Sequence, residues 1–105
     1  MSKIITVDSS NYDSFIAKGT VMIDFSATWC GPCRMLHPIL EEVAVDMEEK
    51  VQIGKIDVDI SGDLAQKYAI MSVPTMVILK DGVKKAQFSG VRAKEAIIEE
   101  INKYL

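Results

Sequence analysis

Two cysteines, Cys30 and Cys33, are the residues of this sequence whose type and spacing most directly indicate chemistry. A disulfide between positions so close together closes a very small loop, so it would restrict the unfolded chain only modestly. In a reducing compartment, such a pair is more often redox-active or metal-bound than structural. The pair therefore indicates either thiol–disulfide exchange or part of a metal site.

The cysteine pair stands where an apolar run, residues 21–27, passes into a segment with helical spacing up to Met47. The unpaired N–H groups of a helix's first turn stabilise a thiolate, so we expect Cys30 to be nucleophilic near neutral pH. Cys33 follows three positions later on the same helical face and can reach its sulfur. The expected reaction is attack of Cys30 on a substrate disulfide, followed by attack of Cys33 on Cys30.

Asp24 and Lys55 are expected to assist this chemistry from the neighbouring strands. Asp24 interrupts an apolar run, and burial of a carboxylate is costly and raises its pKa. Asp24 is then either a proton acceptor for Cys33, through a water, or a hydrogen-bonded core aspartate. Lys55 shares the alternation of Val51 and Ile53. Its stem should therefore lie near Asp24 if the strands are neighbours, where it would tune that carboxyl group; a solvated lysine is the alternative.

An apolar surface for substrate docking is predicted around a Cys30 thiol that we expect to be exposed. The Val73–Pro74 peptide bond is predicted to be cis, which would turn the Val73 backbone outward to pair with an extended substrate segment. A trans proline that starts a strand is the alternative. The residues assigned to this surface are Trp29, Gly31, Pro32, Met71, Val73, Pro74 and Val91.

His37 is the single histidine and the only further imidazole or thiolate available to complete a metal site with the cysteines. Structural zinc usually takes four ligands, so a zinc site is disfavoured, and no metal or other cofactor is expected. A Cys–His hydrolase is disfavoured as well, because no third orienting group or oxyanion site is evident. We interpret His37 as a partly exposed helix residue without a chemical role.

Hydrophobic periodicity predicts a β-α-β-α-β-α-β-β-α order, and thus an α/β fold whose mixed sheet carries helices on both faces. Asp8, Ser9 and Ser10 are expected to cap the first helix, Pro38 to kink the second, and Asp81-Gly82 to form a hairpin turn. The expected strands are 4–7, 21–27, 51–60, 75–80 and 83–89, and the helices lie near 12–16, 33–47, 63–68 and 97–105.

The length and charge of the chain limit its organisation and partners. A chain of 105 residues is expected to form one domain, residues 1–105. The net charge of -3 argues against nucleic acid as a partner. The apolar runs are far shorter than a membrane span, and the N-terminus lacks the apolar core of a signal peptide. We therefore expect a cytoplasmic protein that acts as a monomer and does not bind membranes.

The segment 29–33, Trp-Cys-Gly-Pro-Cys, placed after an apolar strand, resembles the active site of the thioredoxin family. Asp24, Pro38, the Val-Pro-Thr segment 73–75, the turn 81–82 and Gly90 stand where that family places equivalent features. The resemblance spans nearly the whole chain.

The resemblance implies a thioredoxin fold, with about five strands flanked by four helices, and protein-disulfide reductase activity. It also implies recharging by a thioredoxin reductase, with the loop of Pro74 against the dithiol and Gly90 in the substrate site. Met71, Ser72 and Ser89 depart from commoner family choices, which leaves substrate preference open there. An oxidase or isomerase on the same fold and a binding module with an incidental dithiol are the competing functions.

Overall fold

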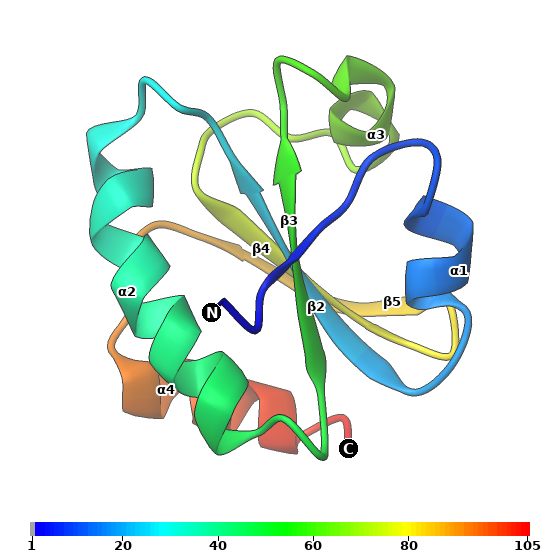
Figure 1. Ribbon diagram of the computed structural model, residues 1–105, viewed down its shortest axis with the longest axis vertical. Helices are drawn as coiled ribbons and strands as arrows, with labels where there is room; N and C mark the ends of the chain where they lie inside the picture. Colours follow the sequence, from blue (N-terminus) through cyan, green and yellow to red (C-terminus); the bar gives the residue numbers. More distant parts are fainter. Residues whose placement is uncertain (1) are drawn as a thin grey trace.

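The computed structural model describes residues 2–105 as a five-stranded mixed sheet between two layers of helices (Figure 1). The strand order is β1-β3-β2-β4-β5. Strands β1, β3 and β2 are parallel, β4 is antiparallel to β2, and β5 is antiparallel to β4. The order of elements and the mixed sheet agree with the prediction. The elements are β1 (Ile5–Thr6), α1 (Tyr12–Ile16), β2 (Thr20–Ser26), α2 (Gly31–Asp46), β3 (Gln52–Asp57), α3 (Gly62–Lys67), β4 (Thr75–Lys80), β5 (Val83–Ser89) and α4 (Lys94–Asn102).

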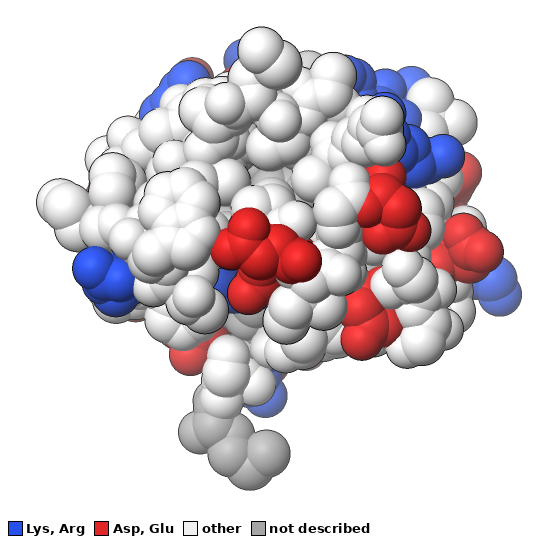
Figure 2. Space-filling model, turned by 90° about the horizontal axis from the view of Figure 1, so that it is seen from above, with Lys and Arg blue, Asp and Glu red and all other residues white. Residues whose placement is uncertain are grey.

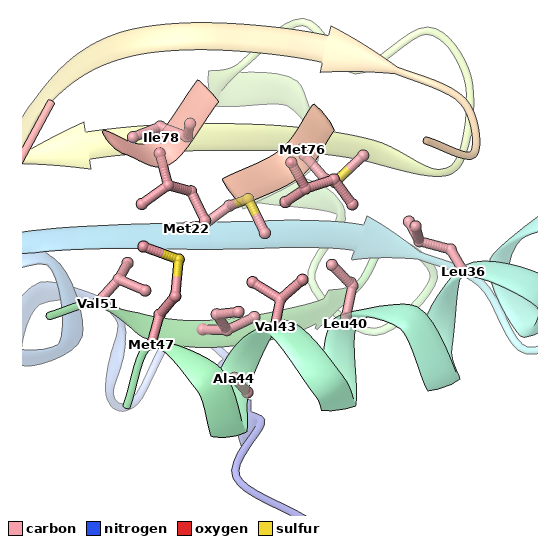
Figure 3. Close-up of a cluster of buried hydrophobic side chains, with 12 residues drawn as sticks. Met22, Leu36, Leu40, Val43, Ala44, Met47, Val51, Met76 and Ile78 are labelled. Carbon is pink, nitrogen blue, oxygen red and sulfur yellow. The ribbon is translucent and has the colours of Figure 1, made fainter. Parts of the chain in front are cut away.

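The central strand β2 is buried on both faces, because α2 and α4 cover one face of the sheet and α1 and α3 the other. Its side chains alternate between the two layers. Val21, Ile23 and Phe25 join the core under α1 and α3, whereas Met22 packs against α2 (Figure 3). Asp24, two positions after Met22, therefore faces the α2 layer.

Several predicted boundaries and the predicted cap of α1 differ from the structure. Strand β3 ends at Asp57 rather than at residue 60, because the Asp57 carboxylate accepts the backbone N–H groups of Asp59 and Ile60 at 2.8 and 3.3 Å and forms a turn. Helix α4 ends at Asn102, short of the predicted residue 105. The capping residues predicted for α1 lie in the preceding turn, where the Asp8 carboxylate accepts the Ser10 N–H at 2.8 Å.

Helix α2 continues through Pro38 without interruption, and the kink predicted there stays a prediction. Its inward side chains, including Leu36, Leu40 and Val43, point toward β2 (Figure 3). Within residues 2–105, no helix has both the length and the apolar character needed to cross a membrane.

Candidate active site

Cys30 and Cys33 form a disulfide at the N-terminus of α2. Cys30 is the N-cap residue, and its sulfur accepts the backbone N–H of Cys33 at 3.2 Å. Pro32 occupies the first turn, where a missing N–H leaves no helical bond unmade. A negative charge on the Cys30 sulfur would therefore be stabilised by a directed N–H group and by the helix dipole.

Both cysteines are buried in the disulfide form, with 4% of Cys30 and 1% of Cys33 exposed. The prediction of an exposed Cys30 thiol is wrong for this state, because Ala27, Val58 and Val73 pack around the pair. The Cys30 sulfur nevertheless lies 3.7 Å from the carbonyl oxygen of Val73. The loop before β4 therefore lies directly against the disulfide.

The Val73–Pro74 peptide bond is cis, which confirms the prediction. The carbonyl oxygen of Pro74 accepts the backbone N–H of Gly90 at 2.9 Å. Gly90 has a φ of 89°, a conformation that side chains disfavour, so a glycine suits this position. Gly90 and Pro74, far apart in the sequence, are thereby brought together beside the dithiol.

The surface around the disulfide carries exposed apolar side chains. Trp29 is 67% exposed, Met71 93% and Val91 39%. The indole N–H of Trp29 donates to the Asp59 carboxylate at 2.8 Å, which holds the ring in place. Figure 2 views this end of the molecule and shows a broad uncharged surface beside acidic side chains.

Asp24 is fully buried, and neither of its carboxylate oxygens has a hydrogen-bond partner among residues 2–105. Burial raises its pKa from 3.8 to about 6 because the charged form loses water, while the positive charge of Lys55 acts in the opposite direction. Lys55 is the partner of Asp24 in the parallel register of β2 and β3 and is half-buried. The predicted proximity of Lys55 to Asp24 is confirmed.

A cavity of about 480 Å³ lies on the same side of the sheet, between α2 and the ends of β2 and β3. Cys33, His37 and Lys55 line it together with Ser26 and Asp57. The Lys55 ammonium donates to His37 Nδ1 at 2.9 Å. The partial exposure predicted for His37 is correct, but this contact was missed. The contact joins α2 to β3, and no local feature of the sequence indicates it.

The comparisons with known proteins agree on one family. The thioredoxin family model matches residues 3–103. A thioredoxin from Chlamydia pneumoniae is 48% identical over 104 residues, 99% of each chain, and one from Staphylococcus aureus is 43% identical over 102 residues, 97% of this chain and 98% of its own. The chain belongs to the thioredoxin family. A solved mutant thioredoxin from Halobacterium salinarum NRC-1 superposes with a TM-score of 0.90 at 32% identity, covering 99% of this chain and 94% of its own.

As a member of the thioredoxin family, the chain is a protein-disulfide reductase whose redox-active pair is Cys30 and Cys33. The family, fold and activity expected from the sequence are confirmed. In this state each cysteine sulfur is bonded to the other rather than free to bind a metal. Within residues 2–105, no three histidine, cysteine or acidic side chains are grouped to hold an ion.

The structure brings the predicted site residues together in two groups. On the outer side of the disulfide lie Val73, Pro74 and Gly90, with Gly31 half-buried and Pro32 exposed at the start of α2. On the inner side, Asp24 and Lys55 lie beneath α2. The disulfide thus lies between an outer group of loop and helix-start residues and an inner pair of titratable side chains.

Proposed function

We propose that Cys30 is the nucleophile and Cys33 the resolving thiol in a two-step reduction of protein disulfides. The Cys30 thiolate attacks one sulfur of the substrate disulfide, forms a mixed disulfide and releases the other substrate sulfur as a thiolate. Cys33 then attacks the Cys30 sulfur, which forms the Cys30–Cys33 disulfide and releases the second substrate thiolate. The observation that supports these roles is the Cys33 N–H directed at the Cys30 sulfur.

Asp24 takes the proton of Cys33 in the second step. A carboxyl group with a pKa of about 6 is a stronger base than an ordinary aspartate, yet it is largely ionised near pH 7. Its place under the N-terminal part of α2 supports the role, and Lys55 adjusts its charge from the next strand. Both residues act before the substrate's second sulfur leaves.

Substrate segments dock on the surface formed by Trp29, Met71 and Val91 and pair with the main chain of Val73. The carbonyl group of Val73, close to the Cys30 sulfur, offers an acceptor to an extended chain. Recognition through backbone groups accepts many sequences, which suits a general reductase. Gly31, Pro32, Pro74 and Gly90 contribute surface without bulky side chains.

In the cell, this chain acts as a monomer in the cytoplasm and forms one domain over residues 1–105. A thioredoxin reductase returns the disulfide to the dithiol, and proteins with accessible disulfides oxidise it again. The near-full-length match to bacterial thioredoxins supports these partners.

The test is catalytic reduction of a protein disulfide with dithiothreitol as electron donor. The native chain accelerates the reaction, and Cys30→Ser abolishes it. Cys33→Ser still attacks but accumulates a mixed disulfide through Cys30, because the resolving sulfur is missing. Adducts trapped on Cys33 in the Cys30→Ser protein, at the rate of the native chain, would reverse the two roles.

The role of Asp24 has its own measurement. Asp24→Asn removes the base, so resolution of a mixed disulfide with a small thiol should slow near neutral pH. Stopped-flow rates of the second step across about pH 6–9, where thiols titrate, compare the two proteins. Equal rates over that window would rule Asp24 out as the proton acceptor.

A further inference from the structure

The Lys55 ammonium lies between two groups that can accept it, and it is bound to only one. Asp24 is its partner across the β2–β3 register, on the same face of the sheet. Yet the ammonium donates to His37 Nδ1 at 2.9 Å, and both Asp24 oxygens remain without a hydrogen-bond partner among residues 2–105. The charge nearest the buried carboxylate is thus directed at a neutral ring on α2.

The Lys55 ammonium is not forced by its position to bond to His37 rather than to Asp24. A lysine has four flexible methylene groups, so its ammonium can reach either a neighbour on the next strand or a residue on the helix above. An ion pair in a poorly solvated site is strong, so a free Lys55 ammonium would turn to the Asp24 carboxylate. His37 prevents this by supplying a competing acceptor.

We propose that His37 is a positioning residue for the reductase reaction: its Nδ1 holds the Lys55 ammonium away from Asp24, and loss of the ring releases that ammonium to the carboxylate. The importance of this contact for catalysis rests on the proposed role of Asp24 as the base for Cys33. The contact itself does not.

Other charged residues near His37 line the same cavity or lie on α2. Arg34 and Asp57 line the same cavity as His37, and so does Cys33. The Arg34 guanidinium donates to the carbonyl oxygen of Thr28 at 2.7 Å. Glu41, one turn further along α2, accepts the hydroxyl of Ser2 at 2.6 Å. Among the cations of residues 2–105, Lys55 alone is hydrogen-bonded to the ring.

The contact with Lys55 fixes the form of the His37 ring. To accept at Nδ1, the ring must be neutral and carry its proton on Nε2.

The direct test is an NMR titration of the Asp24 carboxyl group in the oxidised protein. In His37→Ala, the released ammonium should lower the proton affinity of Asp24 about tenfold. His37→Asn places an amide oxygen near the position of Nδ1 and should keep the native affinity within about twofold. Met35→Ala, a change at an exposed residue on the same helix, is the control and should have no effect. An unchanged Asp24 titration in His37→Ala would overturn the proposal.

A second comparison shows whether His37 acts through Lys55. In a Lys55→Met background there is no ammonium to release, so adding His37→Ala should leave the Asp24 titration unchanged. An equal effect of His37→Ala with and without Lys55 would overturn the proposal, since the ring would then act on Asp24 by itself.

The pH profile of the second step tests the base role of Asp24 separately from the contact between His37 and Lys55. In His37→Ala, the acid limb of the pH profile for resolution by Cys33 should move down by about one pH unit, in step with the tenfold change. A profile unaffected by Asp24→Asn would refute the base role of Asp24, while the NMR titration would still decide whether His37 holds Lys55.

Discussion

Asp24 lies among apolar side chains on its face of the sheet. Met22, on the same face of β2, and Met76, opposite Asp24 on β4, are both fully buried. The pKa of Asp24 is about 6 in the folded protein against 3.8 for an exposed aspartate. Between these two values the folded chain binds more protons than the unfolded chain. The contribution of Asp24 to stability is therefore fully present below pH 3.8 and is lost as the pH rises through 6.

The stability of Asp24→Asn should exceed that of the native chain at pH 8. A pKa difference of this size corresponds to about 3 kcal/mol in the free energy of unfolding, which is an upper limit because the amide is also buried without partners. The advantage should shrink as the pH falls through 6 toward 4. Urea unfolding of both oxidised proteins at several pH values measures it, and a difference independent of pH would contradict the prediction.

The sequence indicates some of these residues more readily than others. Asp24 is conspicuous because a charge interrupts an apolar strand, and Lys55 follows from alternation along the next one. His37 is not predictable in the same way. Its contact depends on the height of α2 above β3 and on the rotamer of Lys55, and neither quantity has a local signature in the sequence.

At the scale of elements, Gly54 lets β1 and α1 pack closely against β3. A Cβ atom at this position would lie 2.7 Å from a methyl group of Val7 and 2.8 Å from the ring of Phe15. Both of these side chains are buried in the core between the sheet and α1. The absence of a side chain at Gly54 therefore sets the spacing of these elements.

Gly54→Ala should lower the free energy of unfolding by about 1–3 kcal/mol, the usual cost of overpacking a core. Gly62→Ala is the matched control, because a Cβ there meets nothing within 4 Å and the residue lies in the first turn of α3. It should be neutral or stabilising by less than about 1 kcal/mol. Chemical denaturation of both variants provides the comparison, and equal stabilities would contradict the packing argument.

The order and type of the elements were predictable because periodicity and turn residues are local properties. The end of β3 was not, since Asp57 stops the strand by a side-chain bond within an otherwise β-rich segment. The lateral order of the strands was not predicted from periodicity either. Alternation shows which residues share a face of a strand, but not that β3 separates β1 from β2.

At the scale of the whole molecule, the fold gathers its substrate surface at one end of the sheet. The N-terminus of α2, the loop before β4 and the segment after β5 meet around the disulfide. Exposed apolar groups lie on this end, which is largely uncharged (Figure 2). Met71, two residues before Val73, is the most exposed of them. Backbone pairing and apolar contact can therefore act on the same substrate segment.

Met71→Lys should weaken docking of protein substrates without changing the chemistry of the dithiol. Loss of about 1 kcal/mol of apolar contact raises KM about fivefold for a disulfide flanked by apolar residues. The kcat for that substrate, and the rate with a small aromatic disulfide that needs no docking, should stay unchanged. Val45→Lys is the control, because Val45 is also exposed but lies about 20 Å along α2 from the site. Steady-state kinetics on both substrates tests this. A KM equal to that of the native chain would exclude Met71 from the docking surface, and an equal rise in Val45→Lys would mean that added charge alone weakens binding.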